Sequence, residues 1–137
     1  MTLGDAGPLI AIIDADEPDH ASCLDALDQL SLPLNTTWPV FTEAMYLVAR
    51  AGGIRVQRAL WRLVSTDRLV VADLSPSAVE RSAWLMDQYA DRPMDLADAS
   101  VVALAEGRGD RRIFTLGTDF QICRLRGRQR FETIPKL

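Results

Sequence analysis

The sequence has few residues that could form disulfides or coordinate a soft metal. Its two cysteines, Cys23 and Cys123, are too few for a disulfide framework and lack the spacing of a metal site. We expect both to be thiols in the reducing environment of the cytoplasm. The single histidine, His20, lies in an acidic loop, and we assign it no catalytic role.

Long hydrophobic runs are also missing. No apolar segment reaches the length of about 20 residues that a membrane-spanning helix needs. The N-terminal stretch carries acids instead of the positive charges that begin a signal peptide. The 137 residues, 48% hydrophobic and 25% charged, match an ordinary globular protein. We therefore expect a single domain over residues 1–137, located in the cytoplasm and without a membrane partner.

Positive charge is absent from the first part of the chain. Residues 1–49 contain eight acids and no Lys or Arg, whereas residues 108–137 contain eight basic residues and three acids. The formal net charge of −4 hides this asymmetry. The pattern indicates an anionic partner near the C-terminal part, or a basic partner near the N-terminal part.

Short apolar segments alternate with amphipathic ones along the whole chain. The alternation predicts an α/β fold, a three-layer α/β/α sandwich around a mainly parallel sheet. The expected strands are 1–5, 32–36, 69–72, 112–115 and 131–134, and the expected helices are 9–13, 21–30, 39–51, 54–64, 76–89 and 94–106, with a helical or turn-like segment at 119–125.

The predicted helix 94–106, MDLADASVVALAE, begins with two acids and continues in small or apolar residues. A helix that is apolar nearly all round is a buried one. Asp95 and Asp98 would lie on one face of its first turn. A divalent cation would offset the cost of burying their charge. The alternative is that Asp95 caps the helix and Asp98 interacts only with the helix dipole.

Other acids lie at the predicted ends of elements. Asp5 ends the first strand, Glu43 lies in the first turns of helix 39–51, and Asp119 follows the fourth strand. Ligand sites of parallel sheets lie beyond the carboxyl ends of the strands. The alternatives are a turn or cap role for Asp5 and a dipole-stabilising surface role for Glu43.

Together these motifs resemble the PIN-domain ribonucleases, and more narrowly the VapC-type toxins of bacterial toxin–antitoxin pairs. The matching stretches are GDAGPLIAIID at 4–14, PVFTEAMYLV at 39–48, MDLADASVVALAE at 94–106 and TLGTDF at 115–120. The resemblance implies a PIN-like fold and a metal-dependent endoribonuclease. It also implies a homodimer and a small antitoxin whose tail covers the acidic groove.

The resemblance assigns the core acidic site to Asp5, Glu43 and Asp98, with Asp95 as an additional acid. The sequence departs from the family at one position, because Gly117 stands where the family usually carries its fourth acid. Asp119 is the nearest acid and is a candidate for that role. Carboxylates are the ligands that Mg²⁺ and Mn²⁺ prefer. We therefore expect Mg²⁺ or Mn²⁺ as the cofactor.

Candidate RNA contacts follow the fourth strand. Arg124, Arg126, Arg128 and Arg130 alternate through RLRGRQR and could meet RNA phosphates, although such a run is commonly a solvated face. Thr115 could orient a carboxylate or bind phosphate, and the simpler explanation is its β-propensity.

Two other functions remain open. Gly117 leaves room for a PIN-like binding module without catalysis. A receiver-like signalling domain shares the parallel sheet and acidic pocket, but it would need a lysine at a strand end. The lone Lys136 makes this a poor match.

Overall fold

Five parallel strands form the centre of the molecule. The computed structural model describes residues 1–117, 120, 124–125 and 129–135. The sheet order is β3-β2-β1-β4-β7, and each neighbouring pair is parallel. This confirms the predicted α/β class. The strands are β1 (Thr2–Gly4), β2 (Leu34–Thr37), β3 (Leu69–Ala72), β4 (Arg112–Phe114) and β7 (Glu132–Ile134).

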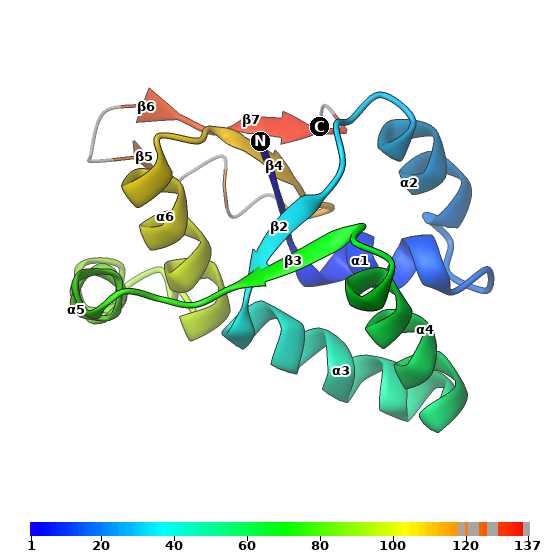
Figure 1. The fold of residues 1–137 in the computed structure, drawn as a ribbon. Helices are drawn as coiled ribbons and strands as arrows, with labels where there is room; N and C mark the ends of the chain where they lie inside the picture. Colours follow the sequence, from blue (N-terminus) through cyan, green and yellow to red (C-terminus); the bar gives the residue numbers. More distant parts are fainter. Residues whose placement is uncertain (118–119, 121–123, 126–128, 136–137) are drawn as a thin grey trace.

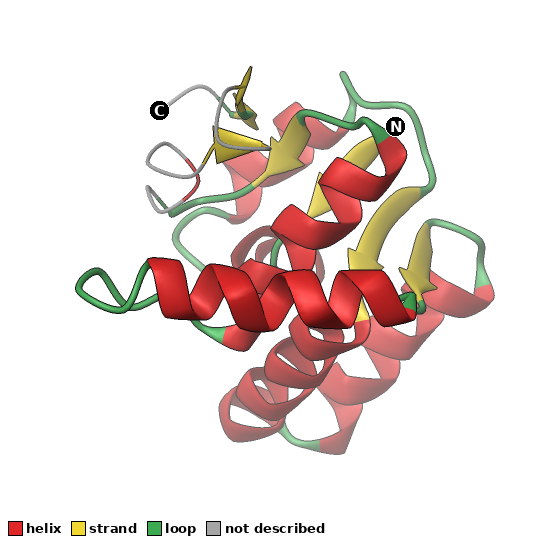
Figure 2. Ribbon diagram, turned by 90° about the vertical axis from the view of Figure 1, so that its left-hand side faces the viewer, coloured by secondary structure: helices red, strands yellow, loops and turns green. Residues whose placement is uncertain are grey.

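Helices cover both faces of the sheet and complete the predicted α/β/α layers (Figure 1). Figure 2 shows α5 outermost on one side, packed against α6, while α1, α2 and α4 lie on the other side. Helix α3 follows β2 directly and contacts both α1 and α6. The helices are α1 (Ala6–Ile13), α2 (His20–Leu27), α3 (Trp38–Gly52), α4 (Ile54–Ser65), α5 (Pro76–Gln88) and α6 (Leu96–Arg108).

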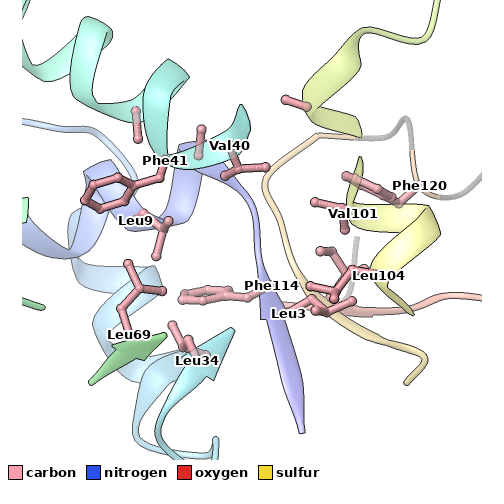
Figure 3. Packing of buried hydrophobic residues seen from close by; sticks show 14 of the residues in the cluster. Leu3, Leu9, Leu34, Val40, Phe41, Leu69, Val101, Leu104, Phe114 and Phe120 are labelled. Atoms are coloured by element: carbon pink, nitrogen blue, oxygen red, sulfur yellow. The ribbon is translucent and has the colours of Figure 1, made fainter. Parts of the chain in front are cut away.

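Hydrophobic side chains from the strands and the inner helices meet in one core. Phe114 of β4 is fully buried, and Figure 3 shows its ring on the side of Leu34, whereas Leu3 points to the other side, toward Leu104. On α6, Ala97 and residues 99–106 are buried, which confirms the prediction of a core helix. Its alanines and valines are small and allow close packing between the sheet and α5.

The structure corrects the end of the segment 119–125, where a helix or turn was expected; residues 119 and 121–123 of this segment lie outside the described residues. Arg124–Leu125 form β5, which pairs antiparallel with β6 (Gln129–Arg130). Two-residue strands are too short for a periodic pattern to distinguish them from a turn. In the described part of the chain, no helix is long and apolar enough to cross a membrane.

Candidate active site at the carboxyl end of the sheet

Helix starts and strand ends bring the predicted acids to one end of the sheet. Asp5 follows β1, Glu43 lies in the second turn of α3, and α6 begins with Asp95 and Asp98. Because β1 and β2 are parallel neighbours, their carboxyl ends lie at the same edge. The topology therefore places acids from three separate elements at one end of the sheet.

Asp5 is held in place from two directions. Its Oδ1 accepts a hydrogen bond from the Ala6 N–H at 2.9 Å, and its Oδ2 accepts one from Thr115 Oγ1 at 3.0 Å. Its own N–H donates to the Phe114 carbonyl at 2.9 Å. Asp5 is the N-cap of α1, so this helix begins at Ala6 and not at Leu9 as expected. The predicted cap role is confirmed, and the bonds orient the carboxylate at the strand end.

Glu43 lies in the electrostatic field of the other acids. The residue is exposed overall, yet partial burial of its carboxyl group raises its pKa above the ordinary value. The charges of Asp95 and Asp5 raise the pKa further. Each of these effects disfavours the ionised form. Three acids from separate elements are therefore close enough for their charges to interact.

Asp95 and Asp98 form the start of α6. Asp95 is its N-cap, and Asp95 Oδ1 accepts a hydrogen bond from the Asp98 N–H at 2.8 Å. The cap alternative for Asp95 is thus confirmed. Asp98 lies in the first turn and is half-buried. Its helical backbone holds the side chain at the same end of the sheet as Asp5.

Thr115 orients Asp5. Its side chain has no exposed surface, donates to Asp5 and accepts from the Gly117 N–H at 3.1 Å. Of the two functional roles predicted for Thr115, the structure shows the bond that orients a carboxylate, and the contact with an RNA phosphate remains a prediction. Gly117 is exposed and contributes only its backbone to this site.

Some of the candidate residues follow β4 in segments that are only partly described. Asp119, Arg126 and Arg128 lie outside the described residues. The backbone of Arg124 lies in β5, and its side chain is also outside the described part. The proposed roles of these four residues remain predictions.

The donors at this site suit a hard cation that keeps much of its water shell. In the part of the chain that the structure describes, no three acidic, histidine or cysteine side chains form a ready-made metal cluster. Mg²⁺ commonly uses one or two carboxylates and keeps several waters. The charges of Asp95 and Asp5 raise the pKa of Glu43, so these carboxylates repel one another. A divalent cation between them would relieve this repulsion.

Comparison with known proteins places the chain in a family. It is 33% identical to Ribonuclease VapC26 of Mycobacterium tuberculosis over 132 residues, which are 96% of this chain and 98% of that protein. The chain belongs to the VapC family of ribonucleases. No protein-family model matches the sequence.

Solved structures of VapC proteins and toxin–antitoxin complexes share the fold at lower identity. M. tuberculosis VapC20, described as a sarcin-ricin loop cleaving toxin, matches with a TM-score of 0.80 and 16% identity, covering 87% of this chain and 92% of that one. A toxin–antitoxin complex from Klebsiella pneumoniae matches with a TM-score of 0.66 and 19% identity, covering 87% and 88%. VapBC2 of Rickettsia felis, bound to a promoter DNA fragment, matches with a TM-score of 0.66 and 13% identity. The match covers 96% of this chain and 97% of that one.

Membership of the VapC family excludes one of the alternative functions raised by the sequence. It confirms the resemblance drawn from the acidic motifs, and it is incompatible with a receiver-like signalling domain. A chain of the VapC family could still lack catalysis. The binding-module alternative therefore has to be tested at the acidic site.

Two residues near the acids were missed by sequence reasoning. Thr37 caps α3, and its Oγ1 lies 2.6 Å from the Ser100 Oγ of α6. The available signals were Thr37 before Trp-Pro, where helix caps occur, and Ser100 as a lone hydroxyl in an apolar helix. Neither signal indicates that the two side chains meet.

The raised pKa of Glu43 predicts that Glu43→Gln stabilises the metal-free protein at neutral pH. A carboxyl group whose pKa is higher in the folded than in the unfolded protein contributes most to the free energy of unfolding below the unfolded-state pKa. This stabilising contribution is lost as the pH rises through the folded-state pKa. The variant should therefore melt higher than the wild type at pH 7 and equally at pH values below about 4. Thermal melting in chelator across this range measures the difference. A Glu43→Gln protein that melts lower at pH 7 would contradict the electrostatic interpretation.

Proposed function

We propose that this protein is a Mg²⁺- or Mn²⁺-dependent endoribonuclease and the toxin of a type II toxin–antitoxin pair. The observation that carries the proposal is the meeting of Asp5, Glu43 and Asp95/Asp98 at one end of the sheet. The chain that holds them matches a named ribonuclease along almost its entire length.

The chain's own residues would bind the ion and keep it in place. Asp5, Glu43 and Asp98 are the proposed ligands, one or two of them directly and the others through waters of the ion, and Asp95 supports them through the cap of α6. A bound divalent ion supplies an acidified water and neutralises negative charge on a phosphate. Thr115 prevents the Asp5 carboxylate from rotating away from the site. No nucleophilic side chain is needed, which suits a site made of carboxylates.

Removing the metal tests this proposal against the non-catalytic alternative. Protein freed of metal with a chelator should leave a structured RNA intact, and adding Mg²⁺ or Mn²⁺ should restore cleavage. A metal-free protein that cleaves as well as the metal-loaded one would overturn metal dependence. A protein that binds RNA but never cleaves it would favour the binding module kept open by Gly117.

The proposed partners are an RNA substrate and an antitoxin protein. Two solved structures that share this fold contain a toxin with its antitoxin, one from K. pneumoniae and VapBC2 of R. felis. An antitoxin tail that enters this site would bring Arg or Lys to the acids, because complementary charge favours binding. The basic run at 124–130 is the proposed contact for RNA phosphates.

We also propose a homodimer through α3 and α4. These helices expose large apolar side chains, which on a monomer would remain in water: Tyr46 (60% exposed), Leu47 (41%), Ile54 (59%) and Trp61 (50%). Light scattering should give twice the 15.2 kDa of one chain. Ile54→Asp should shift the mass to the monomer, and Val79→Asp on exposed α5 should not. A wild-type monomer at high concentration would contradict the dimer.

A further inference from the structure

Two buried hydroxyl groups join the beginning of α3 to the first turns of α6. Thr37 is the N-cap of α3, Ser100 lies in α6, and neither has exposed surface. Their side-chain oxygens lie 2.6 Å apart across 63 positions of sequence. This hydrogen bond is therefore a tertiary link between the two helices that carry Glu43 and Asp98.

The neighbouring bonds determine which hydroxyl is the donor. Ser100 Oγ donates to the Ala97 carbonyl at 2.7 Å. Because a hydroxyl carries one hydrogen, Thr37 must be the donor to Ser100. Thr37 Oγ1 also accepts from the Val40 N–H at 3.4 Å. A directed chain of hydrogen bonds thus runs from the first turn of α3 to the first turn of α6.

The acids lie close to both ends of this chain. Glu43 is on the same helix as Thr37, and Asp98 comes two positions before Ser100 in α6. Both acids carry negative charge when ionised, so their repulsion tends to separate the starts of α3 and α6. Helices move as stiff elements, so a bond at their starts controls the spacing of the carboxylates.

We propose that the Thr37–Ser100 pair positions the acidic site, by fixing the separation of α3 from α6 so that Glu43 and Asp98 act on one divalent cation. The inference rests on the proposed function, because it gives the pair a role at that metal site. Neither hydroxyl touches the ion or the RNA. Both are positioning residues, comparable to the outer partners that orient ligands in other metal sites.

The test is Mn²⁺ binding by the RNA-free protein, followed by the electron paramagnetic resonance signal of unbound Mn²⁺. Thr37→Val keeps the shape and removes the hydroxyl, and it should weaken Mn²⁺ binding about 10-fold. Thr37→Ser keeps the hydroxyl and should bind nearly as the wild type does. Ser100→Ala should match Thr37→Val, and the double variant should be no weaker than either, because both changes break the same bond.

Ser82 provides the matched control. It is a buried serine of α5, and its hydroxyl donates to the Ala78 carbonyl of the same helix at 2.8 Å. Ser82→Ala should leave Mn²⁺ binding unchanged. Ser100→Ala places a strong helix former in α6, so it carries the test if Thr37→Val does not fold.

The failures of the two proposals can be told apart. If wild type binds Mn²⁺ and both Thr37→Val and Ser100→Ala bind it equally well, the positioning role is overturned and the proposed function stands. If Thr37→Ser loses as much affinity as Thr37→Val, packing and not the hydroxyl is responsible, and the positioning role is again overturned. Wild-type protein that binds no Mn²⁺ overturns both proposals.

Discussion

Replacing Asp98 with asparagine should lower RNA cleavage by about 100-fold or more while leaving the fold intact. The change removes one charge and keeps nearly the same shape at the first turn of α6. Asp98 donates its backbone N–H to Asp95, and this bond does not depend on the side chain. Removing a repelling carboxylate from the acids should keep or raise the melting temperature without metal.

Asp95→Asn is the matched control for this prediction. Asparagine is as good an N-cap as aspartate, so the bond to the Asp98 N–H survives and cleavage should fall much less. The helix-dipole alternative predicts the opposite: losses of about 0.3–1 kcal/mol in stability for either change, and no specific effect on cleavage. Full cleavage by Asp98→Asn, with lowered melting and an unchanged metal response, would contradict the assignment of Asp98.

Replacing Phe114 with alanine should strongly lower the free energy of unfolding. Phe114 is fully buried in β4, and Figure 3 shows it in the core between the sheet and the helices. Truncating a buried phenylalanine to alanine costs about 3–5 kcal/mol, because apolar burial is lost and a cavity remains. A domain of this size has a free energy of unfolding of about 5–15 kcal/mol. The variant should therefore lose a large part of its stability.

Denaturant unfolding followed by circular dichroism measures this loss. Val79→Ala is the control, because Val79 is 54% exposed on α5 and its truncation should change stability by less than about 0.5 kcal/mol. A Phe114→Ala protein as stable as the control would show that β4 does not form the centre of the core.

Much of the fold was predictable because hydrophobic pattern and burial coincide. The strand 69–72 and the helices 54–65 and 76–88 follow their apolar spacing to within a residue. Helix α1 begins earlier than expected because Asp5 caps it, and apolar periodicity does not register a cap made by the preceding acid. The β5–β6 hairpin was missed because its strands are only two residues long.

The acids of the site were predictable because strand ends of a parallel sheet converge, and because four motifs together resemble one family. The sequence predicted that Thr115 could orient a carboxylate but not which one, and it did not indicate the Thr37–Ser100 bond. Thr115 and Asp5 are 110 positions apart, and Thr37 and Ser100 are 63 apart. Such pairs depend on the packing of α3, α6 and the sheet, which a single sequence does not specify at the level of individual hydroxyl groups.

The ends of the RNA fragments produced by the metal-loaded protein distinguish hydrolysis at the carboxylates from other ways of cleaving RNA. In attack by a water held at the acidic site, the water oxygen bonds to phosphorus and the 3′ oxygen leaves. We therefore expect fragments with 5′-phosphate and 3′-hydroxyl ends, produced by wild type and nearly absent with Asp98→Asn. Fragments ending in 2′,3′-cyclic phosphate, or equal cleavage by both proteins, would contradict hydrolysis at these carboxylates.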